Sequence, residues 1–257
     1  MIELGRLSCQ LAVVRRACKG LPLGQIYLVR HGQASFGAAD YDQLSAHGVE
    51  QSRLLGQWLA ACKVGVGEVV TGSLKRHRQT AAACLAAMPG TPAADAWRAE
   101  PGFDEYDHIE VLARHAPQLT DPIAAKDALG SETDVKKSFQ KIFAQAMARW
   151  MGGQHDGDYR ESWPAFRARC VGAAKRIVET AGAPTVIVFT SGGPIAAICQ
   201  ELLGIPNERA AMVNFSLANS SVTRLLFSGR DGRISLSYLN NFAHLEQTGQ
   251  VESVTYR

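Results

Sequence analysis

The sequence lacks several features that would assign it at once to a class of protein. Its six cysteines include no Cys-x-x-Cys pair, and no two histidines stand four residues apart, so common zinc-site spacings are absent. No uninterrupted apolar run approaches the length of a transmembrane helix. The formal net charge is only +3 over 257 residues, which disfavours a nucleic-acid-binding or membrane-binding surface. Scattered cysteines are typical of reduced thiols, so we expect a cytoplasmic protein.

The first 24 residues do not resemble the start of a folded domain. Residues 11–14 form an apolar run that Arg15 and Arg16 follow directly, and this run is too short for a secretory signal. We predict an N-terminal arm or extension over residues 1–24, which an upstream start codon would also explain, and one domain over residues 25–257. A cleaved signal is the alternative.

Three runs rich in β-branched residues predict buried strands, at residues 26–29, 64–71 and 184–190. Helical patterns lie between these runs, and Ser45 is a plausible start signal for the first. This alternation predicts a three-layer α/β/α domain with a mostly parallel sheet. Residues 220–227 and 233–239 then predict a C-terminal antiparallel hairpin that adds to one edge of the sheet.

Residues 107–158 have no strong strand pattern. One long helical pattern covers residues 133–151, so we predict a helical insertion that covers one end of the sheet, over the site. The apolar residues of this helix have the spacing of a core stripe, and we assign them to the core and not to a site. They are Phe139, Ile142, Phe143, Met147 and Trp150.

Charged side chains follow the ends of the predicted strands. Arg30 and His31 come directly after the first strand, and Arg76 lies at the start of the helix after the second. Ligands bind at the carboxyl ends of strands in such sheets, and arginine forks and helix N-termini both favour phosphate. An imidazole placed there can attack phosphorus and form a phosphohistidine, which water then hydrolyses. The sequence therefore indicates a phosphoryl-transfer site.

The departing alcohol of such a reaction needs a proton. The stretch GFDEYDH supplies Glu105, Asp107 and His108 as candidate donors.

Four stretches together resemble the phosphoglycerate-mutase-like branch of the histidine phosphatase superfamily. They are LVRHGQ, LSAHGVEQS, SLKRHRQTA and FDEYDH, and they follow the family's order between Gln25 and about Leu245. The resemblance implies that His31 is the phosphorylated nucleophile and that Glu105 is the proton donor. The implied mechanism requires no metal and no organic cofactor.

The same resemblance assigns the phosphate-binding groups. It makes Arg30 and Arg76 the phosphate clamps and places Gln33 against the phosphate. The family has a second histidine after a late strand, usually in S-H-G-G, but here VIVFTSGGP has Ser191 at that position. Its loss could lower the rate about 100-fold, by analogy with removal of one oxyanion donor.

Three interpretations of Ser191 stay open. It can act as a weaker donor to phosphate, helped by the backbone N–H of Gly192 at the start of a helix. A different histidine, His108 or His244, can fill the gap. Alternatively, the pocket binds phosphate without turnover. Ser191 is not expected to be a nucleophile, because Phe189 stands where a nucleophile elbow needs glycine.

The remaining histidines have no ligand-like spacing, and we expect them to be exposed to solvent: His47, His77, His115 and His155. The prediction is a metal-independent phosphomonoesterase that acts on a small phosphorylated metabolite. A phospho-ligand-binding module is one alternative, and a mutase-type phosphotransferase is the other. The mutase is disfavoured because Phe36 and Gly37 replace the usual Trp-Asn pair.

Overall fold

The computed structural model describes residues 23–35, 42–120, 135–228 and 232–256. The predicted N-terminal arm lies outside the described residues, except for its last two. The strands form one sheet in the order β3-β2-β4-β1-β5-β6. Their bounds are β1 Leu23–Arg30, β2 Glu68–Thr71, β3 Arg98–Ala99, β4 Thr185–Thr190, β5 Val222–Ser228 and β6 Ile234–Asn241.

The sheet is mixed, as predicted. The strands β3, β2, β4 and β1 pair in parallel with one another. On the other side of β1, β5 pairs antiparallel with β1, and β6 pairs antiparallel with β5. β2 is shorter than expected and begins at Glu68, after Gly65 and Gly67. The two-residue edge strand β3 was not predicted, because so short a segment carries no detectable alternation.

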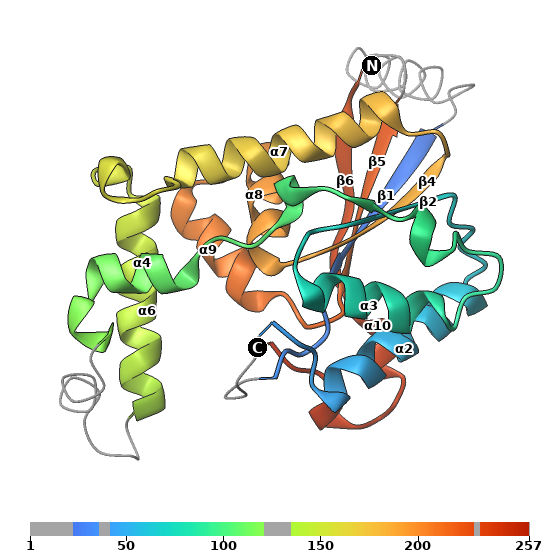
Figure 1. Cartoon of the computed structure of the whole chain (residues 1–257), viewed down its shortest axis with the longest axis horizontal. Helices are drawn as coiled ribbons and strands as arrows, with labels where there is room; N and C mark the ends of the chain where they lie inside the picture. The colour runs from blue at the N-terminus through green and yellow to red at the C-terminus, as the bar shows by residue number, and fades with distance from the viewer. Residues whose placement is uncertain (1–22, 36–41, 121–134, 229–231, 257) are drawn as a thin grey trace, which may run out of the picture.

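Helices cover both faces of this sheet (Figure 1). Their bounds are α2 Ala46–Ala61, α3 Lys75–Leu85, α4 His108–His115, α6 Val135–Met151, α7 Trp163–Thr180, α8 Gly192–Leu203, α9 Asn207–Ser216 and α10 Ala243–Glu246. Within the described ranges, no helix is long and apolar enough to cross a membrane.

Alternation along β1 divides the core into two layers. Tyr27 and Val29 face a cluster with the buried residues of α2 and α3, whereas Ile26 and Leu28 face the larger cluster with α7 and α8. All four side chains are buried, which is the pattern of a strand covered on both sides. This arrangement confirms the three-layer prediction.

Local signals fix the ends of two helices near the functional edge. The Ser45 hydroxyl accepts a hydrogen bond from the Gly48 N–H at 3.0 Å and caps α2, as its sequence position predicted. α8 begins at Gly192 and ends at Leu203, and the next residue, Gly204, has a φ of 62°. A left-handed residue of this kind favours glycine and stops the helix.

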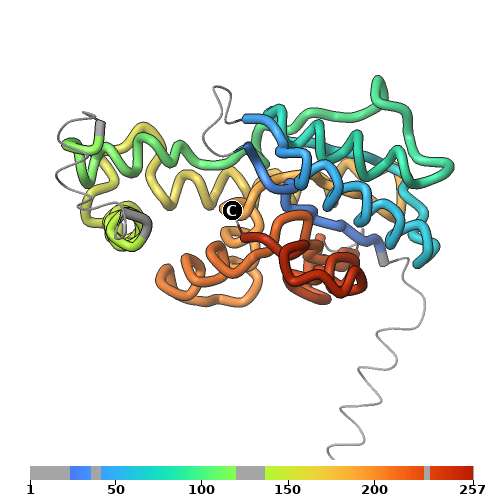
Figure 2. The backbone as a smooth tube through the Cα atoms, turned by 90° about the horizontal axis from the view of Figure 1, so that it is seen from below, coloured from blue at the N-terminus to red at the C-terminus, as the bar shows by residue number. Residues whose placement is uncertain are grey.

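The segment between residues 107 and 158 is helical where it is described. The predicted long helix is α6, and the shorter α4 before it was not predicted. Both lie to one side of the sheet, on the left in Figure 1, and Figure 2 shows the same separation from below. Met147 and Trp150 are buried in the larger core cluster, as predicted, and they attach α6 to α7.

Candidate active site

The site lies where β1 and β4 end side by side. Arg30 pairs with Thr190 in the parallel register, and the His31 N–H donates to the Thr190 carbonyl at 2.8 Å. His31 and Ser191 therefore leave adjacent strands at the same edge. Gly32 lets the chain turn against α2, because a Cβ there would lie 2.3 Å from the Gly48 carbonyl oxygen.

The His31 imidazole is held in its neutral form. Its Nδ1 lies 2.7 Å from the Gly32 carbonyl oxygen, so Nδ1 carries the proton and donates it, and Nε2 keeps its lone pair. Burial lowers the pKa of His31 well below its usual range, and the charges of Arg76 and Arg30 lower it further. An imidazole in this form can attack phosphorus.

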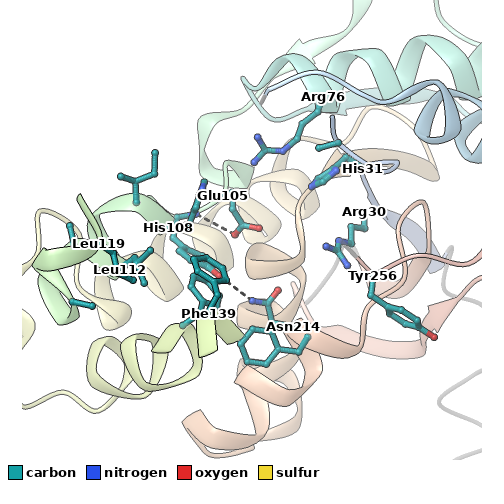
Figure 3. A pocket seen from close by; sticks show the side chains of 17 residues that line it. Arg30, His31, Arg76, Glu105, His108, Leu112, Leu119, Phe139, Asn214 and Tyr256 are labelled. Carbon is teal, nitrogen blue, oxygen red and sulfur yellow. Dashed lines mark hydrogen bonds between the residues drawn. The ribbon is translucent and has the colours of Figure 1, made fainter. Parts of the chain in front are cut away.

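Two guanidinium groups flank His31. Arg76, in the first turn of α3, pairs with Asp42 at 2.9 Å, and Arg30 donates to the Leu217 carbonyl. Figure 3 shows both guanidinium groups and the His31 ring directed into the same space. Asp42 belongs to no motif that would identify it, because it lies far from Arg76 along the chain. Two cations beside an imidazole favour a phosphoryl dianion.

Glu105 lies across the chamber from these three residues (Figure 3). Its carboxylate accepts hydrogen bonds from the N–H groups of Gly193 at 3.3 Å and Tyr106 at 3.2 Å. Burial raises the pKa of Glu105, although the nearby Arg76 charge acts in the opposite direction. A carboxyl group with a raised pKa can hold a proton for a leaving group.

The other two candidate donors differ in position. Asp107 caps α4 by accepting from the Glu110 N–H at 3.0 Å, and it pairs with Arg160 at 2.5 Å. It does not line the chamber, whereas His108 does. Burial lowers the pKa of His108, with a smaller effect from Arg76, so this ring is neutral. Glu105 therefore has the best geometry for a proton donor.

A chamber of about 710 Å³ extends from the charged groups to the insertion. Its far walls come from α4, the 3-10 turn after it, α6, α9 and the C-terminal segment, and most of their side chains are apolar. These include Ile109, Leu112, Leu119, Phe139, Phe143, Phe215 and Tyr256. Leaving Phe139 and Phe143 out of the site was wrong, because both line this chamber, although Phe143 also packs against the larger core cluster as predicted.

Residues of α9 were missed from the sequence. Asn214 and Phe215 line the chamber, and the Asn214 amide donates to the Tyr106 hydroxyl at 3.5 Å. A Cβ at Gly192 would lie 2.5 Å from Oδ1 of the Asn214 side chain, so α8 and α9 are in close contact here. Tyr106 itself stands in the FDEYDH motif, which is the only sequence signal for this wall.

Three predicted phosphate ligands, Gln33, Ser191 and Gly192, do not line the chamber. The Gln33 side-chain oxygen accepts a hydrogen bond from the Ser45 hydroxyl at 2.8 Å, which directs it to the start of α2. Ser191 has no exposed surface, and its hydroxyl lies 2.7 Å from Nε2 of His77. The backbone of Gly192 forms the buried first turn of α8.

The predicted exposure of His77 was wrong, because its side chain is fully buried. His47 and His115 are half-buried, and only His155 is exposed as predicted. His244 does not fill the gap left at position 191, because it is buried elsewhere with its Nε2 2.8 Å from the Ser220 hydroxyl. In the part of the chain that the structure describes, no group of three or more His, Cys, Asp or Glu side chains could hold a metal ion.

Comparison with solved structures finds the same fold in several enzymes. A phosphoglycerate mutase from Bacillus anthracis str. Sterne is 17% identical, with a TM-score of 0.59, over 90% of this chain and 98% of that one. A phosphoserine phosphatase from Entamoeba histolytica, a variant in complex with phosphoserine, is 16% identical with a TM-score of 0.59, over 86% and 98%. A mycobacterial glucosyl-3-phosphoglycerate phosphatase is 21% identical with a TM-score of 0.54, over 85% and 99%.

Sequence comparison gives a more specific result. No curated protein matches the chain at a significant level. The family described as the histidine phosphatase superfamily (branch 1) matches residues 26–240, which is most of the chain. This protein belongs to the histidine phosphatase superfamily, branch 1.

Proposed function

We propose that the protein is a phosphomonoesterase that works through a phosphohistidine on His31. The observation that supports this most is that His31, Arg30, Arg76 and Glu105 line one chamber. A neutral imidazole, two guanidinium groups and a carboxyl group with a raised pKa provide a nucleophile, charge stabilisation and an acid.

In the first half-reaction, Nε2 of His31 attacks phosphorus, and the bond from phosphorus to the ester oxygen breaks. Glu105 gives its proton to that oxygen, so a neutral alcohol leaves. In the second half-reaction, the Glu105 carboxylate takes a proton from water, and the water oxygen attacks phosphorus as the phosphorus–nitrogen bond breaks. Phosphate leaves, and both residues return to their starting forms.

The chamber walls favour an ester of an apolar alcohol. Among the described residues that line it, the side chains with a permanent charge or a carboxyl group are Arg30, Arg76 and Glu105, all at the phosphoryl end. An aryl or alkyl group would bury its surface against the aromatic and aliphatic walls. A phosphoglycerate carries a further carboxylate, for which the described residues of these walls offer no cation, and this favours a phosphatase over a mutase.

The test is phosphate release from p-nitrophenyl phosphate and from a panel of aryl, alkyl and sugar phosphates, with EDTA present. We expect turnover by the native protein and none by His31→Ala. The exposed His155 provides a matched control, and His155→Ala should keep full activity. Mass spectrometry of the native enzyme, quenched in alkaline denaturant, should find a phosphate on His31 that is lost on treatment with acid.

A binding module without turnover is the second candidate, and the serine at position 191 is the observation that favours it. In that case the native protein releases no phosphate from any ester. Arg76→Ala then weakens the binding of inorganic phosphate in calorimetry, whereas Arg78→Ala, an exposed position on the same helix, does not. Phosphate release by the native protein but not by His31→Ala rejects this candidate.

A further inference from the structure

His77 is a fully buried histidine beside His31 that the proposed reaction does not use. It lies in the first turn of α3, next to Arg76 in sequence, and its ring centroid is 6.0 Å from that of His31, with 37° between the ring planes. Burial of an imidazole is unfavourable unless its nitrogen atoms find partners. The partner of each nitrogen therefore indicates what the ring does.

Nε2 of His77 lies 2.7 Å from the Ser191 hydroxyl. Ser191 follows β4 directly, and its side chain forms no capping hydrogen bond with α8. Because Arg30 pairs with Thr190 and the His31 N–H donates to the Thr190 carbonyl, Ser191 leaves β4 beside the point where His31 leaves β1. The His77–Ser191 pair thus lies directly beside the nucleophile.

Nδ1 of His77 lies 3.9 Å from Oδ1 of Asp104, which is too long for a hydrogen bond. This nitrogen is buried and has no hydrogen-bond partner among the described residues. Asp104 is fixed by the Ser73 N–H, which donates to Oδ1 at 2.5 Å. The ring therefore lies between a carboxylate on one side and a hydroxyl on the other.

We propose that His77 is a positioning residue that acts through Ser191 on a phosphoryl group carried by His31. This role rests on the proposed phosphatase function. With a proton on Nε2, His77 donates to the Ser191 oxygen, and the serine's own proton is then available to a phosphoryl oxygen. No covalent bond forms or breaks at either residue. Although Ser191 does not line the chamber, its place beside His31 lets the pair supply one directed hydrogen bond once a phosphoryl group is bonded to the His31 ring.

The charges around the ring are consistent with this role. The groups that face His77 are Arg76 on its own helix, Asp104 and His31. Burial and the Arg76 charge lower the pKa of His77, so the ring is neutral. A bound phosphoryl dianion adds negative charge on the Ser191 side, which favours a proton on Nε2.

The same geometry explains how Ser191 can replace the histidine that the family resemblance led us to expect. An imidazole attached at position 191 would occupy the space that the His77 ring fills, because the two side chains are only 2.7 Å apart. One imidazole therefore lies beside Ser191, and it is that of His77 on α3 and not one at the start of α8. Position 77 can hold it only while position 191 is small.

The test is the steady-state kinetics of p-nitrophenyl phosphate hydrolysis. We expect His77→Ala and Ser191→Ala each to lower kcat by about 10- to 100-fold with little change in KM, because each removes the same hydrogen bond. The double alanine variant should be no slower than the slower single variant. His77→Gln, which keeps an N–H donor, should recover part of the loss.

The combination of His77→Ala with Ser191→His supplies the reciprocal test. It should be faster than His77→Ala alone, whereas Ser191→His in the native background should be slow because the two rings collide. His244 provides a matched control, since it forms a buried hydrogen bond of 2.8 Å with Ser220 outside the chamber. His244→Ala should lower the melting temperature yet keep kcat within about twofold.

Two results would overturn the proposal in different ways. If the native enzyme is active and folded His77→Ala keeps its kcat, His77 has no role in an otherwise correct phosphatase. If the native protein itself releases no phosphate, the proposed function fails and this inference fails with it. Should His77→Ala not fold, then His77→Gln and Ser191→Ala decide the question, because they leave smaller changes in packing.

Discussion

The two residues at the centre of the proposed reaction have pKa shifts of opposite sign from one cause. Burial disfavours the charged form of any group, so it lowers the pKa of His31 and raises that of Glu105. The imidazole therefore stays unprotonated to lower pH than a free histidine. The carboxyl group stays protonated to higher pH than a free glutamate. Nucleophile and acid are thus both in their working forms within one pH range.

Glu105→Gln tests this assignment through the leaving group. We expect kcat/KM for an alkyl phosphate to fall about 100-fold, because an alkoxide leaves slowly without a proton. The loss for p-nitrophenyl phosphate should be less than tenfold, since p-nitrophenolate is a stable anion. In the native enzyme, kcat/KM for the alkyl ester should fall as pH rises through the raised pKa of Glu105, and the variant should lack this limb.

Asp107→Asn is the control for this series, because Asp107 lies on the same loop but points to Arg160. It should leave both substrates unaffected. Equal losses with both substrates in Glu105→Gln would show that Glu105 is not the acid.

At the scale of single elements, α6 contacts the core along one part of its length and the chamber along another. Its C-terminal half buries Met147 and Trp150 in the core, whereas Phe143 and Phe139, one and two turns before Met147, line the chamber. The two phenylalanine rings stack with centroids 6.1 Å apart and 12° between their planes, as residues four apart on a helix can do. One continuous apolar stripe thus forms both core and chamber wall.

Phe139→Ala should weaken the binding of apolar leaving groups. We expect KM for naphthyl or long-chain alkyl phosphates to rise about tenfold with little change in kcat, since the lost contact is equal in ground and transition states. Inhibition by inorganic phosphate should not change. Lys141→Ala, at an exposed position of the same helix, is the control. An unchanged KM would show that the leaving group does not reach α6.

At the scale of the whole molecule, Trp150 joins the insertion to the rest of the fold. Its ring lies 5.2 Å from Trp163 and 5.6 Å from Phe166, both on α7, and 4.9 Å from Tyr106 beside the proposed acid. It is also among the largest fully buried side chains. One aromatic cluster therefore stabilises the insertion and supports one wall of the chamber.

Trp150→Ala should lower the free energy of unfolding by about 3–5 kcal/mol, because it leaves a large cavity that the neighbouring rings cannot fill. Urea denaturation measures this change. Met212→Ala removes an exposed apolar side chain and should alter the stability by less than about 0.5 kcal/mol. A loss below about 1 kcal/mol in Trp150→Ala would mean that the insertion is held mainly by other contacts.

The sequence by itself determined the layers of the fold and the positions of Arg30, His31 and Arg76 at a strand end and a helix start. Strand and helix periodicities are local, and the placement of Arg30 and His31 after one strand follows from the chain alone. The predicted helix start placed Arg76, and the family resemblance assigned the expected roles of Arg76 and Glu105. These expectations rest on short local motifs, which need no knowledge of distant contacts.

Tertiary structure alone decided which side chains meet. His77 stands in the polar run LKRHRQT and has the sequence context of an exposed residue, yet it is buried against Ser191, 114 positions away. Asp42 and the α9 wall were equally undetectable, because burial depends on what packs against a residue and not on its neighbours in the chain. The physical reason is that a strand end or a helix start can be predicted from local periodicity, whereas the wall around it is assembled from contacts between segments far apart in sequence.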